Sequence, residues 1–137
     1  MMAPPMALVA ASVAMMAGCI AVSAQPAPSR LANPASVNCV KQGGALEMER
    51  RPDGGQYGVC VFTDNYQCEE WALFRGECPK GGLRVTGYAT AAGRFCAITG
   101  GRYTVVTETS AGERGVCSLP GGKTCSGDAY YAGTCNR

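Results

Sequence analysis

The spacing of the cysteines constrains this chain more than any other feature of its sequence. Eight of its nine cysteines form two sets with identical gaps, and each member of the second set lies 57 residues after its counterpart. Glycine pairs such as Gly43-Gly44 and Gly100-Gly101 repeat with the same offset. This pattern indicates a tandem duplication of one small unit. The eight cysteines are Cys39, Cys60, Cys68 and Cys78, followed by Cys96, Cys117, Cys125 and Cys135.

The duplicated part follows a segment that is typical of protein export. Ala7 to Ala17 is uncharged and apolar, but it is too short to span a bilayer as a stable helix. We therefore divide the chain into a signal peptide (1–18, or alternatively 1–24), a tether (19–30), module 1 (31–79), a linker (80–92) and module 2 (93–137).

Two cleavage sites are compatible with the export segment. Met16-Ala17-Gly18-Cys19 resembles the lipobox of bacterial lipoproteins, in which Cys19 becomes the lipid attachment site. Val22-Ser23-Ala24 before Gln25 fits ordinary signal cleavage, and no Lys or Arg precedes Cys19, which is unusual for either site. We favour the lipobox, which predicts a membrane-anchored lipoprotein of the cell envelope. A periplasmic or secreted protein is the alternative.

Four cysteines in each small exported module predict a disulfide framework. Zinc is disfavoured because the paired C-x2-4-C knuckles of structural zinc sites are absent. If Cys68 and Cys78 lie at opposite ends of a helix, they are too far apart to bond, which disfavours Cys39–Cys60 with Cys68–Cys78. Of the two remaining schemes we favour Cys60–Cys68 with Cys39–Cys78, and correspondingly Cys117–Cys125 with Cys96–Cys135.

Local signals predict an α+β fold, in which each module consists of a helix, a β-hairpin and a short second helix. Asn33 and Pro34 are typical of a helix start, and Gly43-Gly44 is typical of a helix end. Glu69 to Arg75, with acids first and a base near its end, predicts the second helix.

The hairpin is predicted from alternating apolar and polar residues in 46–49 and from a second strand over 57–62. A Gly-containing loop of odd length places Cys60 opposite Met48. The apolar character of Cys60 and Phe62 is kept in module 2, so this face of the second strand is expected to be buried.

The composition excludes several classes of function. The chain has no histidine, so it has no Ser-His-Asp or Cys-His nucleophile pair and no histidine metal ligand. Its 12 basic and 10 acidic residues include no basic block, and nucleic-acid binding is not expected. We expect a protein that is not an enzyme and that uses neither a metal nor another cofactor.

Several segments of module 1 carry a resemblance to a known family. They read NPASVNC from Asn33, DGGQYGVCVF from Asp53, and CEEWA and RGEC around the last two cysteines. These residues resemble the bacterial domain of unknown function 333, whose members are commonly small exported lipoproteins labelled as candidate hemolysins. The resemblance implies no catalytic residue. Module 2 departs from the pattern, because it lacks the helix-start motif before Cys96 and replaces the Glu-Glu-Trp run by Ser126, Gly127 and Asp128.

The candidate binding residues are Glu69, Glu70 and Trp71, which could hold a basic partner with the indole as an anchor. Acids also stabilise a helix start, and a tryptophan also fills a small core, so the structural interpretation is favoured. Tyr57 with Tyr130-Tyr131 could form a sugar-stacking face. Asp53 and Asp64 are assigned to turns rather than to a calcium site.

We therefore expect a cell-envelope protein that acts as a non-enzymatic binding or structural module. Its partner would be another envelope protein or a cell-wall polymer, and its lipid would hold it on a membrane. The alternative is a secreted or periplasmic inhibitor of a protease or lysozyme, with loops 52–56 and 120–123 as its contact segments.

Overall fold

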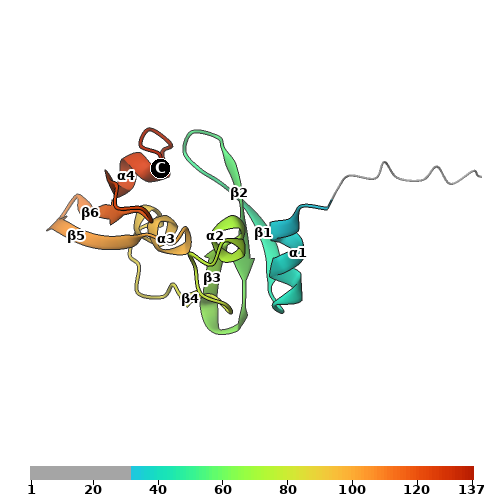
Figure 1. The fold of residues 1–137 in the computed structure, drawn as a ribbon. Helices are drawn as coiled ribbons and strands as arrows, with labels where there is room; N and C mark the ends of the chain where they lie inside the picture. Colours follow the sequence, from blue (N-terminus) through green and yellow to red (C-terminus); the bar gives the residue numbers. More distant parts are fainter. Residues whose placement is uncertain (1–31) are drawn as a thin grey trace, which may run out of the picture. The chain divides into compact units, whose positions relative to one another are not determined.

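The computed structural model describes residues 32–137, and these residues form two copies of one α+β unit. Each copy contains a helix, an antiparallel hairpin, a third strand and a short second helix, as Figure 1 shows. The predicted signal peptide, Cys19 and the tether lie outside the described residues. No helix within 32–137 has the length and apolar character needed to cross a membrane.

Module 1 contains a sheet with the strand order β1-β2-β3-β4, in which β4 comes from the linker. In Figure 1, α1 lies alongside β1. The elements are α1 (Pro34–Lys41), β1 (Ala45–Arg50), β2 (Gln56–Val61), a 3-10 turn η1 (Thr63–Asn65), β3 (Tyr66–Glu69), α2 (Glu70–Phe74) and β4 (Leu83–Arg84).

Module 2 repeats this arrangement with a three-stranded sheet in the order β5-β6-β7. Its helix α3 begins at Ala91, inside the segment 80–92 that was expected to be a linker. The elements are α3 (Ala91–Ile98), β5 (Arg102–Thr109), β6 (Gly112–Ser118), β7 (Thr124–Ser126) and α4 (Gly127–Tyr131).

The two modules start their first helices in the same way. Asn33 caps α1 by accepting a hydrogen bond from the Ala35 amide at 3.0 Å, and Pro34 follows as the first helical residue, as the sequence predicts. Thr90, which is Asn33 displaced by 57, caps α3 by accepting from the Gly93 amide at 3.0 Å. Module 2 lacks the Asn-Pro motif, as the sequence shows, but it forms the expected first helix because a threonine hydroxyl supplies the cap.

The hairpin of module 1 has a different register from the predicted one. Cys60 pairs with Leu46, whereas Met48 pairs with Gly58 and is 59% exposed. The loop is odd in length, as predicted, but the ladder already ends at the pair Arg50 and Gln56. Beyond that pair the Arg51 amide donates to the Gly55 carbonyl at 2.8 Å and the Gly54 amide donates to the Arg51 carbonyl at 2.9 Å, so the turn is centred on Asp53 and not on Gly54, as the predicted register requires.

The disulfides join the cysteines that the sequence analysis disfavoured. Cys39 bonds Cys60 and Cys68 bonds Cys78, with Cα separations of 5.6 and 5.9 Å. The predicted scheme was therefore wrong in both modules. In module 2 the pairs are Cys96–Cys117 and Cys125–Cys135.

The error in the pairing comes from the length of the second helix. Cys68 lies in strand β3, and α2 begins only at Glu70 and ends at Phe74. The chain then reverses at Gly76, which has a φ of 74°, and the amide of Cys78 donates to the carbonyl of Ala72 at 3.1 Å. This helix-ending turn brings Cys78 back beside Cys68.

Strand β2 is buried on both of its faces, whereas the sequence predicted one. Cys60 belongs to the core of module 1, which is built around the two disulfides. Val59 points to the other face, and it packs in a separate cluster with Val85 of the linker and Ile98 of α3. All three side chains are at most 6% exposed. Residues 32–137 thus belong to one compact unit, in which α3 of module 2 covers the outer face of the module 1 sheet.

Candidate functional site: a pocket between the two modules

The two glutamates predicted as binding residues are engaged inside module 1. Glu69 is 8% exposed. Its carboxylate accepts hydrogen bonds from the backbone amides of Trp71 at 3.0 Å and Ala72 at 2.9 Å, so it caps α2. Glu70 is 5% exposed and accepts from Asn33 at 3.2 Å and from Ser36 at 2.6 Å. Both carboxylates therefore hold helices in place.

Trp71, the third predicted residue, is 39% exposed. Its indole meets the ring of Phe74 edge-on, with the ring centroids 5.8 Å apart. Of the three predicted residues, it has the most exposed side chain.

The tyrosines considered for sugar stacking come together around Phe95 of α3. The centroid of the Phe95 ring lies 5.0 Å from that of Tyr57, 5.1 Å from that of Tyr130 and 5.2 Å from that of Tyr131. Tyr57 belongs to module 1 and the other rings to module 2. The packing of the two modules therefore adds Tyr57 to an aromatic cluster whose other rings come from module 2.

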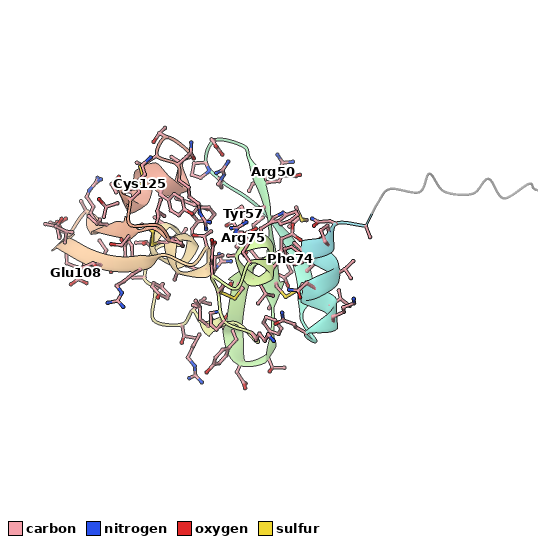
Figure 2. The ribbon with its side chains drawn as sticks, viewed as in Figure 1. Arg50, Tyr57, Phe74, Arg75, Glu108 and Cys125 are labelled. Atoms are coloured by element: carbon pink, nitrogen blue, oxygen red, sulfur yellow. A yellow bond between two sulfur atoms is a disulfide. The ribbon has the colours of Figure 1, made fainter. Side chains whose placement is uncertain are left out.

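A pocket of about 230 Å³ opens beside this cluster. Tyr57, Phe95 and Tyr130 form its aromatic wall, and Glu69 and Thr99 also line it. Three arginines complete the polar part of the lining, and Figure 2 labels one of them next to Tyr57. The three are Arg51, Arg75 and Arg137.

The arginines have fewer acidic partners than their number would require. Arg75 and Arg137 share the single carboxylate of Glu77, at 3.1 and 2.7 Å. Arg51 pairs with Asp53 at 3.1 Å, but its buried Nε has no hydrogen-bond partner among the described residues. Guanidinium groups bind carboxylates and phosphates in a two-pronged fashion, so three arginines that share two carboxylates suit a further anionic group.

Glu77 is charged at neutral pH. Burial acts to raise the pKa of its carboxyl, but the hydrogen bonds from Arg75 and Arg137 outweigh burial and hold the pKa below its ordinary value. Arg137 also donates to the carbonyl of Thr99 at 2.8 Å. These contacts hold Arg137 at the edge of the pocket.

A second ion pair holds the two modules together next to the aromatic wall. The guanidinium of Arg94 in α3 binds both oxygens of Glu49 in β1, at 3.0 and 2.5 Å, and its Nε donates to Gln67 at 2.9 Å. The hydroxyl of Tyr57 donates to Glu49 at 2.7 Å. Burial and this hydrogen bond raise the pKa of Tyr57, so the phenol keeps its proton at neutral pH.

Sequence reasoning missed the arginines of the pocket. Arg51 and Arg75 correspond to Glu108 and Ala132 in module 2, so the repeat contains no second copy of the arrangement that would mark it. Arg51 and Arg75 are also far from Arg137 in the sequence. Their proximity depends on how α3 and α4 lie against module 1.

The two loops considered for an inhibitor differ in their surroundings. The loop at 52–56 lies against module 2, because a Cβ added to Gly133 would meet the carboxylate of Asp53. Asp53 also accepts from the Gly55 amide at 2.9 Å, which is the turn chemistry expected for it. The loop at 120–123 includes Gly121 and Gly122, both with positive φ.

Comparison with known proteins identifies one family. A family model described as Domain of unknown function (DUF333) matches residues 30–77 and again residues 87–134. The two matched segments contain the two sets of four cysteines almost completely, with Cys78 and Cys135 just outside them. No curated protein and no solved structure matches the chain significantly.

Proposed function

The chain belongs to the DUF333 family as two tandem copies of its domain, and on that premise we propose that it is an exported, non-enzymatic binding protein of the cell envelope. A lipid on Cys19 holds it on a membrane, and the pocket between the modules binds its ligand. The observation that carries the proposal is this pocket, where three arginines lie beside an aromatic wall.

The lining of the pocket supports a ligand that combines an anionic group with a ring. Arginine donors recognise a carboxylate or a phosphate. The Tyr57 and Phe95 rings offer the apolar faces on which sugar rings and other flat groups pack. Cell-wall polymers of bacteria contain both kinds of group, and we propose such a polymer as the ligand.

Binding without catalysis is consistent with the chemistry of the lining. Tyr57 keeps its proton at neutral pH, so it does not serve as a base. Both oxygens of the Glu69 carboxylate accept hydrogen bonds from backbone amides of α2, so they are already engaged within the chain. The arginines orient an anion and do not transfer protons.

Co-sedimentation with purified peptidoglycan sacculi tests this proposal. The full chain in mild detergent should sediment with sacculi, and the double variant Arg75→Ala with Arg137→Ala should bind at least tenfold more weakly, because it removes two of the three cations. Chitin, which has sugar rings but no carboxylates, should bind weakly to both proteins.

The matched control is Arg114→Ala, which removes an exposed arginine of module 2 that pairs with Asp128. This variant should bind sacculi like the unaltered chain. An equal loss in the control would indicate general charge attraction and not a site. Stoichiometric inhibition of a protease or lysozyme by the same preparation would favour the inhibitor alternative.

A further inference from the structure

Four exposed apolar side chains of module 1 form a continuous surface on α1 and α2. Val37 and Val40 are 38% and 64% exposed, and Trp71 and Phe74 are 39% and 49% exposed. We call these four residues the helix patch. Large exposed apolar surfaces that gather in one place are commonly interaction sites.

The four side chains are connected through shared contacts. Trp71 packs edge-on against Phe74. Phe74 and Val37 line one surface hollow of about 370 Å³, and Figure 2 shows Phe74 on the side of α2 that faces α1. Val37 and Val40 line a second hollow of about 320 Å³. Lys41 borders both hollows.

The duplicated module shows that the fold does not require this patch. The counterparts of Val37 and Trp71 in module 2 are Arg94 and Asp128, which are charged. The counterpart of Phe74 is Tyr131, whose ring packs on Phe95 in the aromatic cluster. In module 2 these positions are either charged or packed into the aromatic cluster, whereas in module 1 they are apolar and exposed.

The position of the patch along the chain indicates its occupant. Helix α1 is the first described element, so the tether joins module 1 beside Val37. The segment from Cys19 to Pro34 reaches at most about 50 Å when it is fully extended. A chain anchored at Cys19 thus keeps α1 close to the bilayer surface, which raises the local concentration of lipid around the patch.

The chemistry of the patch also suits a lipid surface. Tryptophan and phenylalanine favour the boundary between headgroups and acyl chains, and a bordering lysine can extend to the headgroup phosphates. The carboxylates of Glu69 and Glu70 at the start of α2 are buried and bonded within the chain, so they do not repel those phosphates.

We propose that the helix patch lies on the membrane that holds the Cys19 lipid, with Trp71 inserted at the level of the headgroups. This inference rests on the proposed lipid anchor and adds a second point of contact. The lipid and the patch act together, because a small apolar patch alone binds a bilayer reversibly. Module 1 then has a fixed orientation on the bilayer and does not swing freely on its tether.

Trp71 is the chain's single tryptophan, so its fluorescence reports on the patch without labelling. The lipidated full chain is reconstituted into phosphatidylcholine vesicles with and without one-fifth phosphatidylglycerol and a headgroup-proximal doxyl lipid. We expect a blue-shifted emission, quenching by the doxyl lipid, and protection from aqueous acrylamide relative to the chain in detergent micelles. Phosphatidylglycerol should strengthen the quenching through Lys41.

The double variant Val37→Glu with Val40→Glu keeps the reporter and should lose most of the doxyl quenching. Its matched control is Val105→Glu with Val106→Glu, two exposed valines on β5 of module 2, which should keep the quenching of the unaltered chain. Circular dichroism of each variant verifies that the fold is retained.

Flotation of the vesicles separates the two proposals. If the chain does not float, the lipid anchor and the membrane-facing patch both fail. If it floats but Trp71 is unquenched by doxyl lipid and open to acrylamide, the anchor stands and the patch proposal is overturned. Equal quenching in the Glu variant would overturn the assignment of the patch to these residues.

Discussion

At the scale of single residues, the ion pair of Glu49 and Arg94 joins the two modules. The two side chains are 29% and 23% exposed, so water screens their attraction only in part. Burial acts to raise the pKa of Glu49, but the hydrogen bonds from Arg94 and Tyr57 outweigh it and lower the pKa below 4.5. A lowered carboxyl pKa means that the pair stabilises the fold above pH 4.5 and loses this contribution as the pH falls through the folded pKa.

A double-mutant cycle with Glu49→Gln and Arg94→Met measures this contribution. Urea unfolding of the four proteins gives the coupling free energy between the two side chains. We expect about 1 kcal/mol at pH 7, because the hydrogen bonds of the pair are charge-assisted and both side chains are partly buried. The coupling should shrink toward zero at pH 3. The exposed pair Arg114 and Asp128, with side-chain exposures of 77% and 63%, should show no measurable coupling at either pH. A coupling that stays constant between pH 7 and pH 3 would contradict the assignment.

At the scale of elements, the link between α1 and β1 is limited by the disulfide beneath it. Gly44 ends this link, and a Cβ placed on it would lie 2.3 Å from the Cys60 sulfur and 3.1 Å from the Cys39 sulfur. Gly101 occupies the same place in module 2, with its added Cβ 2.6 Å from the Cys117 sulfur. Glycine thus allows each hairpin to lie directly on its own disulfide.

Replacing Gly44 by alanine tests this packing. The variant should lose about 1–3 kcal/mol of unfolding free energy, because the added methyl group must displace the Cys39–Cys60 bridge. Gly87→Ala is the matched control, since a Cβ there meets nothing within 4 Å, and it should change the stability by less than about 0.5 kcal/mol. Urea unfolding under non-reducing conditions measures both. Equal stability of the two variants would show that the bridge does not lie against Gly44.

At the scale of the whole molecule, the cluster of Val59, Val85 and Ile98 joins the two modules through shared apolar burial. Ile98 is fully buried although it belongs to the helix of module 2 and lies against the sheet of module 1. Each module alone is small for a stable hydrophobic core, so the shared cluster adds apolar burial that neither module has by itself.

Truncating Ile98 to alanine should lower the unfolding free energy by about 2–5 kcal/mol, and Ile98→Val by about 0.5–1.5 kcal/mol. Trp71 fluorescence follows the unfolding of module 1, although the substitution is in module 2. We expect the Trp71 midpoint in urea to shift with the stability of the whole chain. If neither substitution changes the urea midpoint measured by Trp71 fluorescence, the two modules unfold independently.

The sequence by itself determined the internal repeat, the α+β class of each module and the local helices and strands. The offset of 57 between the cysteine sets predicted two copies of one unit, which the family matches and the structure confirm. The cap at Asn33 and Pro34 predicted the start of α1, because a helix start depends on neighbouring side chains and their own backbone. The loop of odd length between the hairpin strands was predicted for a similarly local reason.

Only the tertiary structure decided the disulfide partners, the second buried face of β2 and the pocket. The pairing of Cys68 with Cys78 depends on a helix that ends after five residues and on the reversal at Gly76, and a difference of one helical turn would separate the two sulfurs. The burial of Val59 depends on Ile98, which arrives from another module. The pocket arginines are brought together by that same packing. Local sequence patterns predict how one segment folds. These contacts join segments that are far apart in the sequence, and local patterns do not predict which distant segments pack together.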